Sequence, residues 1–301
     1  MNKKKHVVCF GEVLWDVLPD VRKPGGAPMN VAYHLNRLGI QSSMISRIGA
    51  DRIGKQLKDF LRERDIITDF IQTDFQYPTS EVIASIGEDN EVNYEIVFPV
   101  AWDFIEYEEQ FDSLIEDADI LVYGSLAARN QTSRHTLYQL IDRAKYRLFD
   151  VNLRDPHFSK ETVTDLLKRS DAVKLNSSEL QVISSWLGNI SGNEANRIAM
   201  IQQEFGISEI ILTKGSQGAS YYTENERYDY RAYPVEVQDT IGSGDSFLAA
   251  FISQKLSGKS VEEMLDYAVA LGAFVSSQSG ANPPYRIADL HHFVWDKKLK
   301  G

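Results

Sequence analysis

The sequence predicts an α/β fold: a doubly wound, mostly parallel sheet with helices on both of its faces. Two observations lead to this prediction. Short apolar runs rich in β-branched residues alternate with longer helical segments along most of the 301 residues. The runs are almost continuously apolar, as is typical of strands that are buried on both faces of a parallel sheet. A chain of this length can also bury a sizeable core.

Six runs are expected to form the strands of this sheet, and the clearest helices lie between them. The expected strands are residues 6–11, 43–49, 120–125, 147–152, 172–176 and 209–215, and the expected helices include residues 30–39, 53–64 and 133–144. No internal repeat and no proline-rich or low-complexity linker divides the chain. We therefore expect one α/β domain that spans residues 1–301.

Residues 79–99 interrupt this alternation, because no helix separates their two strand-like runs. Apolar and polar side chains alternate over residues 92–98, which is the period of a half-buried antiparallel strand. The polar stretch at residues 87–91 would provide the turn of a β-hairpin. We expect a small flap outside the main sheet, and a purely decorative surface hairpin is the alternative.

The charge and the cysteine content exclude several classes of protein. The formal net charge is −11 and there is no basic stripe, whereas affinity for nucleic acid comes mainly from clustered Lys and Arg. The single cysteine, Cys9, lies in an apolar run. This excludes a disulfide framework and a cysteine zinc site, and it predicts a core thiol in a reducing compartment. A small anionic ligand is compatible with the charge, since it needs only local donors.

No targeting segment or membrane-spanning segment is predicted. Glu12 and Asp16 interrupt the apolar start of the chain too soon for a signal peptide. No apolar stretch approaches the ~20 residues needed to span a bilayer. We therefore expect a cytoplasmic protein that binds neither nucleic acid nor a membrane.

Polar residues follow one expected strand after another, and together they would line one rim of the sheet. Ligands of open parallel sheets bind in the crevice beyond the carboxyl ends of the strands. Each of these side chains could instead cap the helix that follows its strand, and it is their position on one edge that favours a ligand site. The residues in these positions are Glu12, Asp16, Ser125, Asp150, Asn152, Arg154, Lys174, Asn176, Glu179, Thr213, Lys214 and Gly215.

Asn176 and Glu179 illustrate the two alternatives, which the sequence leaves open. Asn176 or Ser177 could cap the following helix, with Glu179 as the capping-box partner. Alternatively, Asn176 could contact a phosphate or a metal-bound water, and Glu179 could hold Mg²⁺ from the outer sphere. Mg²⁺ keeps several water ligands and often uses only one or two carboxylates beside substrate phosphates.

Residues 23–35 form a glycine-rich turn that leads into a helix. Gly25 and Gly26 allow the backbone to approach a ligand closely, and Pro28 suits an early helical position. Asn30 would point back toward the rim. Junctions between glycine and a helix are common, so this turn indicates a ligand site only in combination with other features.

The segment 239–247, DTIGSGDSF, is the strongest functional signal in the sequence. A buried helical pattern begins near Gly244 or Asp245, and Gly242 and Gly244 permit φ values at which successive N–H groups converge. Together with the positive end of the helix dipole, these amides would bind an anion. The alternative is a turn that only caps a helix.

Asp245 indicates which reaction this loop could perform. A carboxylate beside a bound phosphate would repel it, unless the carboxylate faces a hydroxyl that attacks the phosphorus and gives up its proton. The amides would then stabilise charge on the transferring group. The loop is neither a Walker A motif nor a dinucleotide-binding GxGxxG motif. Phosphoryl transfer to a hydroxyl is therefore one candidate reaction.

Two widely separated segments resemble the signatures of one family. DTIGSGDSF resembles the C-terminal signature, DTxGAGD, of the ribokinase-like (PfkB-type) carbohydrate kinases, and GGAPMNVAYHLNRLG followed by RIGADRIGKQL resembles their N-terminal signature. GEVLWDVLP, YEIVFPVAWDFI, FDVNLR and SGANPP are most similar to the fructokinase branch. The resemblance covers essentially the whole chain. It implies a ribokinase-like fold with a small β lid formed by about residues 12–24 and 76–100.

The resemblance also implies a role for each matching residue. Asp245 matches the catalytic base, Gly242, Ser243 and Gly244 match the anion hole, and Arg154 matches an arginine near the transferred phosphate. Asp16, Gly25, Gly26 and Asn30 match sugar-binding positions, and Phe98 would form an apolar wall of the lid. Asn176, Thr213, Lys214, Gly215 and Gly218 match nucleotide-binding positions, Glu179 matches a residue that holds Mg²⁺, and Asp239 and Ile241 match part of a K⁺ site. Ser243 stands where the family usually has alanine, and it preserves the backbone N–H.

The resemblance implies an ATP- and Mg²⁺-dependent sugar kinase that converts D-fructose to fructose 6-phosphate. Many members also bind K⁺, and members often form homodimers through the lid. Another sugar such as ribose, a sugar acid such as 2-keto-3-deoxygluconate, or a nucleoside is an alternative substrate. A sugar- or nucleotide-binding protein without activity is an alternative of a different class. The intact Asp245 argues against it, because a binding protein needs no base there.

Overall fold

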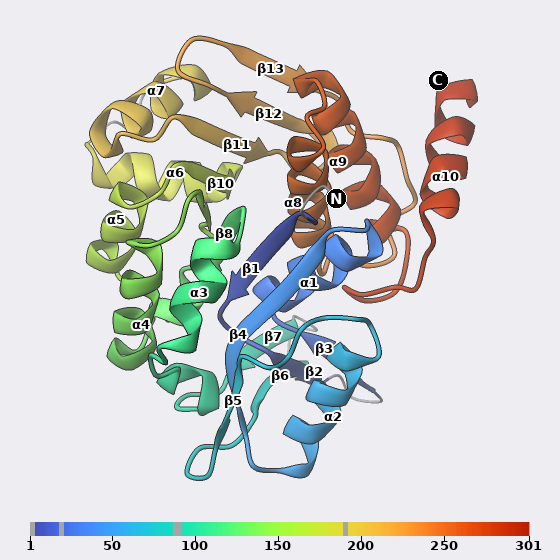
Figure 1. The fold of residues 1–301 in the computed structure, drawn as a ribbon. Coiled ribbons are helices and arrows are strands. Elements are labelled where there is room, and N and C mark those ends of the chain that lie inside the picture. Colours follow the sequence, from blue (N-terminus) through green and yellow to red (C-terminus); the bar gives the residue numbers. More distant parts are fainter. Residues whose placement is uncertain (1–3, 18–20, 87–91, 189–191, 301) are drawn as a thin grey trace.

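The computed structural model describes residues 4–17, 21–86, 92–188 and 192–300, and it shows the predicted α/β fold (Figure 1). The strands of the main sheet are β1 (His6–Phe10), β4 (Gln41–Gly49), β5 (Ile71–Asp74), β8 (Ile120–Gly124), β9 (Arg147–Asp150), β10 (Ala172–Asn176), β11 (Glu209–Thr213), β12 (Ala219–Tyr222) and β13 (Arg227–Tyr230). Their order across the sheet is β13-β12-β11-β10-β9-β8-β1-β4-β5. Neighbouring strands are parallel except at one edge, where β12 is antiparallel to β11 and β13 is antiparallel to β12.

Helices cover both faces of this sheet and enclose two apolar cores (Figure 1). On one side lie α1 (Ala27–Arg37), α2 (Arg52–Arg62), α8 (Ser243–Leu256), α9 (Val261–Ser276) and α10 (Ile287–Lys300), and on the other lie α3 (Gln110–Asp117), α4 (Gln131–Ile141), α5 (Lys160–Lys168), α6 (Ser177–Trp186) and α7 (Glu194–Phe205). Val7 and Cys9 of β1 enter one core, while Val8 and Phe10 enter the other. Burial on both faces explains why the strands are almost continuously apolar. Among the described helices, none is long and apolar enough to cross a membrane.

β1 lies where the order of the strands reverses. β4 and β5 extend the sheet on one side of β1, and the chain then returns to place β8 on its other side. In open α/β sheets, ligands bind at such a switch point, beyond the carboxyl ends of the strands. The residues that follow β1, beginning with Gly11 and Glu12, therefore hold a central position at that edge.

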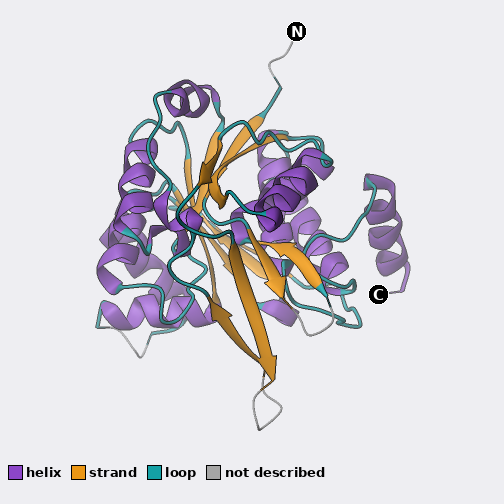
Figure 2. Cartoon of the chain, turned by 90° about the horizontal axis from the view of Figure 1, so that it is seen from below, coloured by secondary structure: helices purple, strands orange, loops and turns teal. Residues whose placement is uncertain are grey.

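A second sheet occupies the region to which the sequence assigns the lid. It consists of β2 (Leu14–Val17), β3 (Arg22–Gly25), β6 (Ser80–Ile86) and β7 (Val92–Ile96), in the order β3-β2-β6-β7. β6 and β7 pair antiparallel, which confirms the expected hairpin, while its expected turn at residues 87–91 lies outside the described residues. Figure 2 shows strands that extend beyond the helices covering the main sheet.

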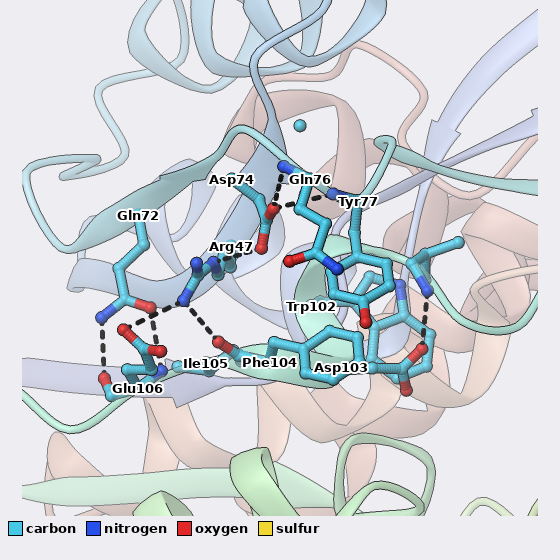
Figure 3. A network of polar contacts seen from close by, with 12 residues as sticks. Arg47, Gln72, Asp74, Gln76, Tyr77, Trp102, Asp103, Phe104, Ile105 and Glu106 are labelled. Atoms are coloured by element: carbon cyan, nitrogen blue, oxygen red, sulfur yellow. Dashed lines mark hydrogen bonds and ion pairs between the residues drawn. The ribbon is translucent and has the colours of Figure 1, made fainter.

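A polar network ties both ends of this hairpin to the main sheet (Figure 3). The Nε of Arg47 on β4 lies 2.7 Å from a carboxylate oxygen of Asp74, and its Nη1 donates to the Phe104 carbonyl at 2.7 Å. Asp74 also accepts hydrogen bonds from the amides of Gln76 and Tyr77. The Tyr77 ring stacks on Phe104, with ring centroids 4.0 Å apart. The chain therefore enters and leaves the hairpin at one anchored point.

The expected elements are present, and the differences at their ends have local causes. The expected helix 30–39 begins earlier, at Ala27, because Gly26 has a φ of 111° at the N-cap and Pro28 fits the first turn. Residues 23–25, expected at the start of a glycine-rich turn, belong instead to the strand β3. The expected strand 147–152 ends at Asp150, since the chain turns at Asn152, which has a φ of 38°.

Candidate active site

A cavity of about 480 Å³ opens beyond the carboxyl ends of the parallel strands, next to the second sheet. It is lined by residues that follow β1, β9 and β10, by the end of β11, and by the N-termini of α1 and α8. The predicted site residues in its lining are Asp16, Gly26, Asn30, Arg154, Asn176, Glu179, Thr213, Ile241, Gly242, Gly244 and Asp245. The structure thus brings residues of both glycine-rich segments to one cavity.

The N-terminus of α8 presents backbone donors to this cavity. The helix begins at Ser243, and no side chain caps it. The first amides of a helix have no acceptor within the helix, so these N–H groups and the helix dipole can bind an anion. Gly242 has a left-handed φ of 74°, and a Cβ there would lie 2.5 Å from the Ala281 Cβ. The prediction for Gly244 is wrong in one respect, because Gly244 lies within the helix and has no positive φ.

Asp245, in the first turn of α8, is held by a chain of amide side chains. The Nδ2 of Asn30 donates to Asp245 Oδ2 at 2.8 Å, and the Nδ2 of Asn282 donates to Asn30 Oδ1 at 2.8 Å. Asn282 thereby orients the Asn30 amide so that its NH₂ group faces Asp245. Burial raises the pKa of Asp245, while the nearby ammonium of Lys174 acts in the opposite direction. Apart from its place in SGANPP, Asn282 has no feature in the sequence that points to this contact.

A buried ion pair lies beside the first turn of α8. The Nζ of Lys174 is 2.9 and 3.0 Å from the two carboxylate oxygens of Asp150. A Cβ added to Gly244 would lie 3.1 Å from the same Nζ, so the ammonium is close to the α8 amides. Burial alone would lower the pKa of Lys174, but neighbouring carboxylates, Asp150 first, raise it overall and keep the group charged. The sequence names Lys174 only as one of the polar residues of the rim, and its place inside an apolar strand is the signal that could have given it more weight.

Asn176 and Glu179 form the capping box that one alternative expects. Asn176 Oδ1 accepts from the amides of Ser178 and Glu179, both at 2.9 Å, and Glu179 Oε2 accepts from the Asn176 amide at 2.7 Å. Glu179 Oε1 accepts from the Leu153 amide at 3.0 Å, so both carboxylate oxygens already have protein donors. Both residues nevertheless line the cavity. A carboxylate held in this way fits an Mg²⁺ ion bound through water better than a directly ligated one.

Carboxylates gather on the side of the cavity next to the second sheet. Asp16 on β2 and Glu12 after β1 line it together with Asp245. Burial raises the pKa of Asp16 to about 6, Arg154 lowers it, and Asp245 adds to the rise. Gly25 leaves room for Asp16, because a Cβ there would lie 2.2 Å from Asp16 Oδ2. The sequence identifies Glu12 only as a polar residue of the rim.

The predicted nucleotide residues beyond Thr213 do not line the cavity. The Nζ of Lys214 donates to Ser220 Oγ at 2.5 Å and lies 3.6 Å from a Glu194 oxygen, so this side chain is engaged with the edge strands. Gly215 begins the 3₁₀ helix η3 (Gly215–Gln217), and Gly218 ends it. Any contact of Lys214, Gly215 or Gly218 with a nucleotide would therefore come from the backbone.

Phe98 does not line this cavity either. Its ring is 54% exposed and lies against Arg129, whose guanidinium carbon is 4.9 Å from the ring centroid. Phe98 belongs to a separate cavity of about 310 Å³ that also contains Ser125 and His157. Val82 of β6 and Ile96 of β7 occupy the place in the main cavity that the sequence assigns to Phe98.

Asp239 connects the loop that leads into α8 with the segment that follows α9. Its Oδ1 accepts from the Ile241 amide at 3.0 Å, and its Oδ2 accepts from the Gly280 amide at 2.9 Å. The amides of Gln238 and Asp239 both donate to the Ser276 carbonyl. The segments 238–242 and 276–281 are therefore in contact, as a K⁺ site shared between them would require. The cation itself stays a prediction.

Known proteins resemble this chain in both sequence and fold. The profile described as pfkB family carbohydrate kinase matches residues 3–288. A fructokinase from Solanum tuberosum is 26% identical over 301 residues, covering 92% of this chain and 91% of that protein. The structure of a fructokinase with bound ATP from Xylella fastidiosa has a TM-score of 0.88 at 22% identity, covering 98% of this chain and 100% of that one. A fructokinase from Vibrio cholerae O395, in its fructose-, ADP- and calcium-bound form, has a TM-score of 0.83 at 25% identity, covering 96% and 99%.

The family match spans nearly all of the described chain, and the likeness to the solved fructokinases extends over both of its sheets. The doubly wound fold and the resemblance to the fructokinase branch are both confirmed. The chain belongs to the pfkB family of carbohydrate kinases.

Proposed function

We propose that this carbohydrate kinase transfers the γ-phosphoryl group of ATP to D-fructose, giving fructose 6-phosphate, with Asp245 as the general base. The observation that supports this most is that Asp245, the first amides of α8 and the Lys174 ammonium meet in one cavity. Phosphoryl transfer to a hydroxyl needs a proton acceptor and anion-binding groups side by side. The fructokinases of Solanum tuberosum and Vibrio cholerae support fructose as the acceptor.

In this proposal, different groups take up the proton and the negative charge. The sugar hydroxyl gives its proton to the Asp245 carboxylate while its oxygen bonds to the γ-phosphorus, and ADP leaves with the electron pair of the broken P–O bond. The amides of residues 242–244 and the Lys174 ammonium stabilise negative charge on the transferring group. Arg154, which is exposed at the cavity, would contact the same phosphate.

ATP would occupy the side of the cavity formed by β10 and β11. Asn176 and Thr213 line that side, and the backbone of residues 214–218 lies beyond them. Glu179 and Asn176 would hold Mg²⁺ through water, and the ion would neutralise charge on the phosphates. K⁺, if bound, would lie by Asp239 and Ile241.

The side of the cavity next to the second sheet favours a neutral sugar over a sugar acid. Glu12, Asp16 and Asp245 all line that side. Burial raises the pKa of both Glu12 and Asp16, and the Asp245 charge adds to each rise. A carboxylate on the ligand would increase this repulsion, whereas sugar hydroxyls can donate hydrogen bonds to these oxygens. This charge distribution argues for fructose over 2-keto-3-deoxygluconate.

The second sheet would serve as a lid over the sugar. Val82 and Ile96 on its strands provide apolar cover to the cavity. Closure would exclude water, so that the sugar hydroxyl and not water receives the phosphoryl group. The same sheet is the surface through which a homodimer is predicted.

An ADP-release assay with Mg-ATP and a panel of acceptors tests the proposal. The panel contains fructose, ribose, 2-keto-3-deoxygluconate and a nucleoside, and fructose should give the highest kcat/KM. Asp245→Asn should lower kcat by ~10²–10⁴-fold, the range of general-base catalysis. Asp296→Asn, which changes an exposed carboxylate on α10, should retain the wild-type rate.

Two results would contradict the proposal. An Asp245→Asn variant that phosphorylates fructose as fast as the wild type would show that Asp245 is not the base. A wild-type protein that binds ATP and fructose but turns over no acceptor of the panel would favour a binding protein on this fold.

A further inference from the structure

Glu12 follows β1 at the switch point of the sheet and is only 2% exposed. Its Oε1 accepts a hydrogen bond at 3.3 Å from the amide of Ala27, the first residue of α1. The N-cap of α1 is Gly26, and no side chain within the helix start caps it. One oxygen of Glu12 therefore supplies the acceptor that the start of α1 otherwise lacks.

The second oxygen, Oε2, is buried and has no hydrogen-bond partner within the described part of the chain. A buried acceptor without a donor is destabilising, and nearly all such groups in folded proteins are paired. The Glu12 side chain lines the cavity alongside Asp16 and Asn30. The unpaired oxygen thus lies where a ligand can bring the missing donor.

Gly26 allows Glu12 to lie against the start of α1. It has a φ of +111°, and a Cβ there would lie 2.4 Å from the Glu12 carbonyl oxygen and 3.4 Å from the Glu12 Cγ. A larger residue would displace Glu12 from this place. The glycine that the family resemblance assigns to the sugar site therefore also positions a carboxylate in that site.

The surroundings of Glu12 decide what kind of ligand group fits. Burial raises its pKa to about 7, and Asp245 adds to the rise, while the amides of Glu12 itself and of Ala27, and then Arg154, act in the opposite direction. A second anionic group would meet repulsion from both carboxylates. A hydroxyl is neutral, has a proton to donate, and would satisfy Oε2 without adding charge.

We propose that Glu12 is a substrate-binding residue that accepts a hydrogen bond from a sugar hydroxyl other than the one that faces Asp245. This inference rests on the proposed sugar kinase function and adds a determinant of specificity to it. A sugar without a hydroxyl at that position leaves Oε2 unpaired, and a sugar with a carboxylate there meets like charge.

Equilibrium binding of fructose without ATP, measured by calorimetry, tests the contact directly. Glu12→Gln keeps an oxygen for the Ala27 amide but turns the other side of the group into a donor. We expect it to weaken fructose binding about 10- to 100-fold, the range for a hydrogen bond to a charged acceptor, and to change ATP affinity less than twofold. Glu116→Gln, at an exposed glutamate of α3, is the matched control and should bind like the wild type.

Monodeoxy analogues of fructose identify the hydroxyl and separate a binding role from a structural one. One analogue should bind the wild type 10- to 100-fold more weakly than fructose does, yet bind Glu12→Gln about as well as fructose does. Glu12→Asp, which keeps the charge but withdraws it by one methylene, should show the same selective loss. It replaces Glu12→Gln in the comparison if that variant does not fold.

The outcomes distinguish this inference from the proposed function. If the wild type binds fructose and both Glu12 variants bind it equally well, Glu12 only caps α1 and the proposed contact is wrong. If every deoxy analogue loses affinity equally in the wild type and the variant, the contact is also wrong. A wild type that binds no sugar of the panel would overturn the proposed function together with this inference.

Discussion

Replacing Glu12 with glutamine should make the ligand-free protein more stable at alkaline pH. Burial, reinforced by Asp245, raises the pKa of Glu12 from 4.5 to about 7 in the folded protein. Between these two values the folded protein keeps a proton that the unfolded chain has lost. The free energy of unfolding therefore falls as the pH rises from about 4.5 to about 7, and it stays at the lower level above that range.

The size of this loss follows from the two pKa values. The interval from 4.5 to about 7 corresponds to about 3–4 kcal/mol, at about 1.4 kcal/mol per pKa unit. About 2–3 kcal/mol of it should be lost between about pH 5 and about pH 8, because the unfolded carboxyl is already largely ionised at the lower pH. Glutamine carries no charge, so Glu12→Gln should escape this loss.

Urea denaturation of both proteins at two pH values measures the effect. The difference in the free energy of unfolding between Glu12→Gln and the wild type should grow by about 2–3 kcal/mol in favour of the variant from about pH 5 to about pH 8. Titrations of other groups largely cancel in this difference. Glu116→Gln should show no such growth. A difference for Glu12→Gln that is independent of pH would refute the argument that Glu12 is a buried, destabilising charge.

Three further predictions concern the neighbouring groups. In urea denaturation, the free energy of unfolding of Lys174→Met should be about 3–5 kcal/mol lower than that of the wild type, because Asp150 is left as an unpaired buried charge. Adding Asp150→Asn should restore stability but not kcat. A restored kcat would exclude a role for the ammonium in the reaction. Gly242→Ala should lower Tm strongly, because its positive φ and the neighbouring chain both oppose a side chain. Gly244→Ala, within a helix, has only to displace the Lys174 ammonium, so it should lower Tm less while lowering kcat; equal Tm losses would contradict the difference in their backbone geometry. Asn282→Ala should lower kcat about 5- to 10-fold, which is the effect of about one lost hydrogen bond. It should also shift the pH–rate profile, while KM for ATP stays constant. An unchanged profile would mean that Asn282 does not act through Asp245.

The sequence could predict those features that depend on short segments. Apolar runs such as residues 172–176 are strands because both of their faces are buried, and this pattern is visible in one dimension. The anion-binding N-terminus of α8 also follows from a local glycine and helix pattern. The sequence therefore predicts the sheet, the rim and the loop that holds Asp245.

The rest depends on contacts between distant segments, which no local pattern contains. Asn282 reaches Asp245 only through Asn30, and no local feature of the segment around Asn282 reveals such a partner. The family resemblance implies that Phe98 forms an apolar wall over the sugar, yet its ring packs on Arg129 instead. The direction of a side chain at a strand end depends on tertiary packing, which the alternating pattern does not specify.

The hydrogen bond between Asn30 and Asp245 joins residues that are 215 positions apart, and Tyr33 bonds to the Pro283 carbonyl across 250 positions. During synthesis, Asn30 and Tyr33 leave the ribosome long before Asp245 and Pro283. Contacts of such long range form late in folding, because most of the intervening chain must already be ordered. A nascent chain that stops before α8 has no complete sugar site, and it also lacks α8 and α9, which bury one face of the main sheet. The ability to bind the substrate therefore arises only with the last part of synthesis, and a protein truncated before α8 should neither bind sugar nor complete this core.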